Sequence, residues 1–158
     1  IVILFMQYLI IFLISMVPLI ELRGAIPYAI GFKLPLLPSY IICILGNMLP
    51  VPFIFLFARK ILVWGSDKKY IGGFFNWCLK KGEKGGKKLQ EKAGRGLYVA
   101  LFLFVGIPLP GTGAWTGTLA ASLLDMDFKK STLAVMCGVV LAGIIMGLVS
   151  GGVFSFIR

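Results

Sequence analysis

Long stretches without a charged residue constrain this sequence more than any other feature. Four of them, residues 1–19, 34–58, 97–124 and 131–157, make up more than half of the chain. Charged residues amount to 14% of the sequence, whereas a soluble domain typically carries about 25%. The sequence therefore predicts an all-α integral membrane protein rather than a soluble enzyme.

The chain offers few side chains for catalysis or metal binding. It contains no histidine, which removes histidine metal sites and Ser-His-Asp triads. Its three cysteines, Cys43, Cys78 and Cys137, are far apart in apolar or aromatic surroundings and lack metal-ligand spacing. We therefore expect no enzymatic activity, no metal site and no cofactor.

Most of the positive charge lies in one block. Residues 59–95 hold eleven of the sixteen lysines and arginines, and the net charge of the whole chain is +10. Short basic loops stay on the cytoplasmic side of a membrane, so residues 67–96 are predicted to be a cytoplasmic linker. Tyr70, Phe74, Trp77 and Cys78 share one face of a helix, which favours a short interfacial helix there. The expected partners are membrane lipids, with no nucleic acid, because the block is short, broken by glycines and flanked by apolar segments.

Two of the apolar segments can cross a membrane. Spanning takes about 20 helical residues. Residues 39–64 and 131–157 are longer than this, and Pro50 and Pro52 are expected to kink the first of them.

A third apolar segment is interrupted at its middle. Residues 97–107 are too few to span, and they are followed by a tip that contains Pro108, Pro110, Gly111 and Gly113. Residues 114–124 are then apolar again, so we expect two half-length helices joined as a re-entrant hairpin. Irregular backbone at membrane depth is tolerated only where protein or a water-filled cavity covers it.

The start of the chain repeats this order. Residues 1–17 are apolar, Pro18 interrupts them, and residues 20–30 follow. Residues 1–17 could form a re-entrant arm or nearly span the membrane. We predict one membrane domain with two repeats, residues 1–66 and 97–158, each a re-entrant hairpin plus a long transmembrane helix. A single spanning helix per repeat makes the second repeat inverted relative to the first.

Glu21 and Arg23 are the charges near the first tip, where Pro18, Gly24 and Pro27 shape the backbone. A charge within the bilayer costs at least about 2.5–3.5 kcal/mol, so such residues usually serve function or a required pairing. Two residues apart on a helix, they point in different directions and each needs a partner elsewhere. The alternative is that both are solvated at the outer membrane interface.

The second tip provides polar groups of another kind. Thr112 and Thr116 carry hydroxyls, Trp115 carries an N–H donor, and the half-helix that follows has free backbone N–H groups and a positive dipole end. With Arg23 nearby, we expect an electropositive site, although small residues such as Gly111 and Gly113 also favour plain helix packing. Asn47 could face this cavity or bind a neighbouring helix. The glycine stripe at 143, 147 and 151 could serve internal packing or a homodimer interface.

The motifs at residues 18–27 and 106–115 resemble those of the small multi-drug export family of bacteria and archaea. The resemblance covers essentially the whole chain and implies a multi-pass protein of the cytoplasmic (inner) membrane. That family is thought to be related to DedA-type membrane proteins, which implies paired re-entrant hairpins, lipid-carrier recycling and dependence on the proton gradient. The family's name implies drug efflux.

These features together predict a small, proton-coupled transporter. Arg23 and the half-helix N-termini would hold an anionic lipid head group, such as a polyprenyl phosphate, or a small amphipathic substrate. Glu21 would carry the proton, and Thr112, Trp115, Thr116 and Asn47 would line the site. The alternatives are a non-transporting assembly factor, a lipid scramblase, or a transporter that exports cationic drugs.

Overall fold

A computed structural model describes residues 1–77, 80, 94–109 and 112–157, and all the regular elements in these ranges are helices. The helices are α1 (Val2–Met16), α2 (Glu21–Gly31), α3 (Leu36–Met48), α4 (Pro50–Ser66), α6 (Gly96–Gly106), α7 (Ala114–Leu123) and α8 (Phe128–Ile157). The predicted all-α class is thus confirmed.

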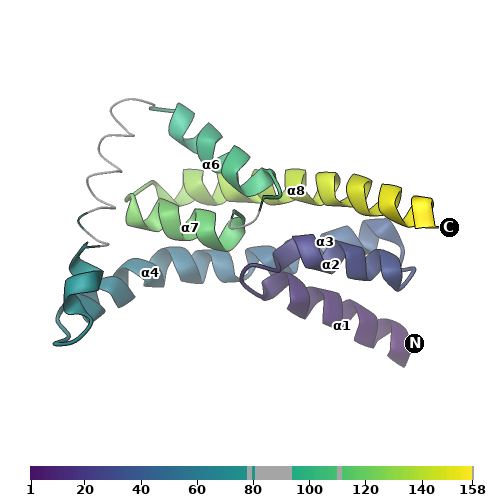
Figure 1. Cartoon of the computed structure of the whole chain (residues 1–158), viewed down its shortest axis with the longest axis horizontal. Coiled ribbons are helices and arrows are strands. Elements are labelled where there is room, and N and C mark those ends of the chain that lie inside the picture. The colour runs from purple at the N-terminus through teal and green to yellow at the C-terminus, as the bar shows by residue number, and fades with distance from the viewer. Residues whose placement is uncertain (78–79, 81–93, 110–111, 158) are drawn as a thin grey trace.

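Two helical stretches are long and apolar enough to cross a membrane. They are residues 36–66, which comprise α3 and α4, and residues 128–152 of α8. The helix α3 ends at Met48 and α4 begins at Pro50, so the predicted long segment is divided immediately before its two prolines. Leu49 between them keeps helical dihedral angles, and its N–H binds the carbonyl of Leu45, so α3 and α4 follow one another along the molecule (Figure 1).

The remaining helices form two antiparallel pairs. Figure 1 shows α2 running back beside α1, and α7 running back from the end of α6. The apolar helices α1 and α6 have 15 and 11 residues, fewer than a perpendicular span requires. Pro18 lies in the loop between α1 and α2, and positive φ angles of 72° and 50° occur at Leu19 in this loop and at Glu21, the first residue of α2. The backbone reverses tightly there.

The two halves of the chain pack into each other. The helix α2 contacts α8, and α7 contacts α4, so each short helix lies against the long helix of the other half. The core between them includes Ile11, Leu22, Val105, Val135 and Val139, all at most 1% exposed. Many large apolar side chains lie on the outer surface instead, as expected for a protein that faces lipid.

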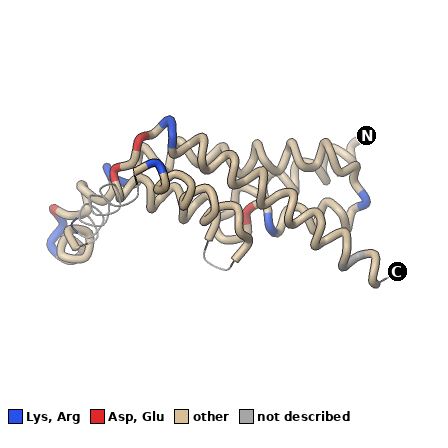
Figure 2. The backbone as a smooth tube through the Cα atoms, turned by 90° about the horizontal axis from the view of Figure 1, so that it is seen from above, with Lys and Arg blue, Asp and Glu red and all other residues tan. Residues whose placement is uncertain are grey.

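Charged residues are segregated along the long axis. Figure 2 shows most of them at one end, which we call the polar end, and an acidic and a basic position near the middle of the molecule. The helix α2 begins at that middle position with Glu21. At the polar end Arg59 of α4 forms an ion pair with Asp125, 2.6 Å away.

The predicted interfacial helix is described in part. Residues 72–77 are helical, and the rings of Phe74 and Trp77 stack with centroids 6.3 Å apart. Cys78 and most of the remaining linker, residues 81–93, lie outside the described residues.

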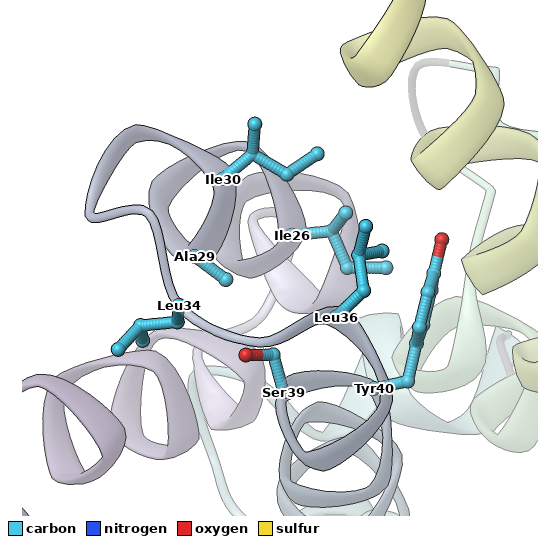
Figure 3. A pocket seen from close by; sticks show the side chains of 7 residues that line it. All are labelled: Ile26, Ala29, Ile30, Leu34, Leu36, Ser39 and Tyr40. Atoms are coloured by element: carbon cyan, nitrogen blue, oxygen red, sulfur yellow. The ribbon is translucent and has the colours of Figure 1, made fainter.

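The glycine stripe of α8 packs within the molecule over part of its length. A Cβ atom on Gly147 would lie 1.3 Å from the hydroxyl oxygen of Tyr40, and Gly143 also lies beside the Tyr40 ring. Figure 3 shows Tyr40 extending from α3 toward α8, at the edge of a small apolar pocket of about 10 Å³ that includes Ile26, Leu34 and Ser39. No atom lies within 4 Å of a Cβ on Gly151, so in the described structure this part of the stripe is open.

Candidate functional site

The carboxylate of Glu21 lies at the N-terminus of α7. Its Oε2 accepts a hydrogen bond of 3.0 Å from the backbone N–H of Ala114, and its Oε1 accepts one of 2.9 Å from that of Trp115. The side chain is 3% exposed. Helix N-termini carry unpaired N–H groups and a positive dipole end, so they favour an anion. A carboxylate from the first half of the chain thus caps a helix of the second half.

Gly113 makes this close approach possible. It precedes α7 with a φ of 134°, a conformation that residues with a side chain rarely adopt. A Cβ atom at this position would lie 2.5 Å from Oε2 of Glu21. The predicted non-helical backbone at Gly113 is therefore confirmed, whereas Pro110 and Gly111 lie outside the described residues.

Arg23 binds the loop that precedes α7. Its Nη1 donates to the carbonyl oxygen of Leu109, and its Nη2 donates to the hydroxyl oxygen of Thr112 at 2.6 Å. The Thr112 hydroxyl has carbonyl acceptors at Ile107 and Leu109, 2.9 and 2.8 Å away. Arg23 thus satisfies carbonyl and hydroxyl groups of the second tip, while Glu21 satisfies its N–H groups.

Trp115 connects the same tip to the end of α1. Its indole Nε1 donates a 3.0 Å hydrogen bond to the carbonyl oxygen of Met16, the last residue of α1. The backbone N–H of Trp115 already binds Glu21 at the start of α2. One residue of the second half therefore contacts both helices of the first pair.

The structure brings together four of the predicted binding residues, Glu21, Arg23, Thr112 and Trp115. We call this cluster the tip contact. Thr116 follows on α7 and is partly buried. Asn47 of α3 is 2% exposed, and its Oδ1 has no hydrogen-bond partner in the described structure.

The predicted backbone positions have different surroundings. Pro27 lies inside α2, and a Cβ on Gly24 would lie 2.3 Å from Cγ2 of Ile20. Pro108 lies after the end of α6.

Sequence reasoning expected the free N–H groups at the start of α7 but missed two acceptors that complete the contact between the tips. The carbonyls of Met16 and Leu109 belong to apolar residues, whose side chains give no polar signal. It also missed Ser122, whose hydroxyl donates to the carbonyl of Phe55 at 2.8 Å and joins α7 to α4.

In this contact an anionic group of the protein itself, the Glu21 carboxylate, is bound. The contact offers two converging backbone N–H groups, a guanidinium and a hydroxyl, with one carboxylate in place. Among the described residues, no group of three histidine, cysteine, aspartate or glutamate side chains could hold a metal ion.

Comparison with known families identifies one to which the chain is similar over most of its length. The model of a family described as "Putative small multi-drug export protein" matches residues 21–145, which include the second tip and the part of the first tip from Glu21 onward. This chain belongs to that family, in agreement with the resemblance of its two motifs. Neither the curated proteins nor the solved structures gave a match.

Proposed function

We propose that this chain is a small secondary transporter whose substrate site lies where two re-entrant hairpins meet. In this proposal α1–α2 and α6–α7 are the hairpins, α3–α4 and α8 span the membrane, and residues 67–96 lie in the cytoplasm. The two halves are then inverted repeats, an architecture common among secondary transporters. Three features support this: the shortness of α1 and α6, the mid-length position of the tip contact, and the segregated basic residues.

The binding of Glu21 at α7 carries the argument for an anionic substrate. Both carboxylate oxygens accept backbone N–H groups, so this position holds an anionic group with two acceptor oxygens. A substrate carboxylate or phosphate presents the same pattern of acceptors. We infer that Glu21 stands in for the substrate when the site is empty, and that the substrate displaces it.

Protonation of Glu21 would make that exchange easier. A protonated carboxyl group is neutral and is held less strongly at a positive helix end. The freed N–H groups and Arg23 would then bind the substrate anion by donating hydrogen bonds to it. Proton and anion would bind together, so an inward proton gradient would drive the anion toward the cytoplasm. Recycling of a lipid phosphate at the inner membrane, which the DedA-type resemblance implies, requires that direction.

A cationic drug fits this geometry less well. It would have to draw Glu21 away from Ala114 and Trp115, which would leave two buried N–H groups without acceptors. Each such group costs about 1–3 kcal/mol. Export of cationic compounds, which the family's name suggests, therefore remains the rival that an experiment must separate.

Purified protein in vesicles with an imposed pH gradient tests the proposal. Farnesyl phosphate serves as the anionic probe and ethidium as the cationic one. We expect an acidic exterior to drive farnesyl phosphate inward, and Glu21→Gln to bind it while losing the response to the gradient. Arg23→Ala should weaken binding more than Arg23→Lys does, because lysine retains the charge but loses the fork of donors.

Asp67→Asn is the matched control, since it removes an exposed carboxylate far from the tips. Ethidium flux that depends on Glu21, with no movement of farnesyl phosphate, would favour drug export. If Glu21→Gln only lowers abundance and the remaining protein behaves as wild type, Glu21 serves the fold alone. Flux that ignores the gradient in the wild type would point to a scramblase.

A further inference from the structure

A groove separates α6 and α8 at the polar end, away from the tip contact. Its volume is about 690 Å³. It is lined by Arg95, Tyr98, Val99 and Phe102 before and within α6, and by Lys130, Leu133, Ala134 and Cys137 of α8. We call it the α6–α8 groove.

The two walls of the groove follow the same pattern. On each side four lining residues are spaced i, i+3, i+4 and i+7, which places them on one helix face. In both sets the first residue is a cation, Arg95 or Lys130, and all the others but Tyr98 are apolar. Both helices run in the same direction away from the polar end, so the two cations lie at its mouth (Figure 1). The last lining residue of each wall, Phe102 or Cys137, lies about 10 Å deeper than the cation of the same wall, at 1.5 Å of rise per residue.

The mouth of the groove is positively charged. Within the described part of the chain, neither Arg95 nor Lys130 forms an ion pair. The Nζ of Lys130 lies 5.8 Å from the centre of the Tyr98 ring. Asp127 is a nearby acid, and its Oδ2 accepts the backbone N–H of Lys130 at 3.1 Å, as a helix cap. The N-termini of α6 and α8 add positive dipole ends at the same place.

We infer that the α6–α8 groove binds a membrane phospholipid with an anionic head group. Its phosphate lies between Arg95 and Lys130, and one acyl chain follows Val99, Phe102 and Leu133 toward Cys137. Charge complementarity selects the head group, and the apolar walls accept the chain. This site shares no residue with the tip contact, so it is independent of the proposed transport function.

The native cysteines provide the test. Cys137 is exposed in the groove, whereas Cys43 is buried, so a Cys78→Ser protein should react with a maleimide at Cys137. The labelling rate is measured in detergent micelles while phosphatidylglycerol or phosphatidylcholine is added. We expect phosphatidylglycerol to slow labelling at much lower mole fractions than phosphatidylcholine. In Arg95→Gln/Lys130→Gln, the phosphatidylglycerol needed for half-protection should rise by about 30-fold, from the loss of two basic contacts.

Lys68→Gln/Lys69→Gln is the matched control, because it removes the same charge outside the groove. This variant should behave as the Cys78→Ser parent. Equal protection by phosphatidylcholine would overturn the inference in favour of non-selective lipid contact. If glycerol phosphate without any lipid protects Cys137, the groove is a site for free anions. If the control variant loses as much protection as Arg95→Gln/Lys130→Gln does, the effect is diffuse charge attraction. If the double variant elutes as aggregate, Lys130→Gln alone, at an exposed position, must still weaken protection about fivefold for the inference to stand.

Discussion

Gly113 leaves the space that the carboxylate of Glu21 occupies, although 92 positions separate the two residues in the sequence. A methyl group on residue 113 would lie 2.5 Å from Oε2, within the space that its hydrogen bond to Ala114 requires. The tip contact therefore depends on the absence of a side chain at one position as much as on the presence of a charge at another.

The first prediction concerns Gly113→Ala. The substitution should destabilise the protein by about 2–4 kcal/mol, because alanine is strained at this φ and its Cβ meets Glu21. Thermal unfolding in detergent, followed by the loss of monodisperse protein, measures this. Gly152→Ala is the control: no atom lies within 4 Å of its Cβ, and a mid-helix alanine costs nothing. Equal melting temperatures for the two variants would contradict the close approach.

A second prediction compares two replacements of Glu21. Glu21→Ala leaves the N–H groups of Ala114 and Trp115 buried without acceptors, at about 1–3 kcal/mol each. Glu21→Gln keeps one acceptor oxygen, so its loss of stability should be roughly half that of Glu21→Ala. The melting temperature in detergent should therefore fall in the order wild type, Gln, Ala. A Gln variant less stable than the Ala variant would show that the carboxylate does not cap α7.

The third prediction tests the orientation in the membrane. Lys33 follows α2, and Lys69 follows α4 in the basic linker. In a background with Cys78→Ser and Cys137→Ser, an impermeant maleimide should label Lys33→Cys in intact cells but label Lys69→Cys only after permeabilisation. The reverse pattern would invert the proposed topology, and labelling of both from outside would remove the spanning role of α3–α4.

A fourth prediction addresses the glycine stripe of α8. Gly147→Ala should lower stability by about 1–3 kcal/mol, because its Cβ would displace the Tyr40 hydroxyl. Gly151→Ala should be neutral, and Tyr40→Leu combined with Gly147→Ala should recover part of the loss. If cross-linking between two copies of the protein decreases in Gly151→Ala while the melting temperature is unchanged, the outer part of the stripe belongs to a homodimer interface.

The sequence predicts the helices well because prolines and glycines nearby in the sequence determine where they begin and end. Pro108 and Gly113 interrupt the apolar run at the places where α6 and α7 end and begin. The long segments 39–64 and 131–157 correspond to α3–α4, which begins three residues earlier and ends two later, and to α8, which begins three residues earlier. Pro27 behaves differently: it lies inside α2, past the first turn, where it removes one helical N–H donor without ending the helix.

The partners of Glu21 and Arg23 were beyond sequence reasoning. Burial of an ion near the bilayer centre indicates that a partner exists, but not which one. Here the partners are the Thr112 hydroxyl and backbone groups of Leu109, Ala114 and Trp115, whose availability depends on how the second tip is folded. Asn47 illustrates the same limit: its polarity allowed either a place in the cavity or a bond to a neighbouring helix, and its Oδ1 lies buried without a partner in the described structure.

The 94 positions between Glu21 and its hydrogen-bond donor at Trp115 have a consequence for biosynthesis. Ribosomes add about 5–20 residues per second, so the first hairpin waits roughly 5–20 s before its capping partner is made. During that interval its carboxylate has no donor from the second half and, in the proposed topology, is costly in hydrocarbon. The first hairpin should therefore stay shallow, or be sheltered by the insertion machinery, until α7 arrives. Truncated nascent chains that end before residue 114 should be extractable from the membrane more easily than full-length ones.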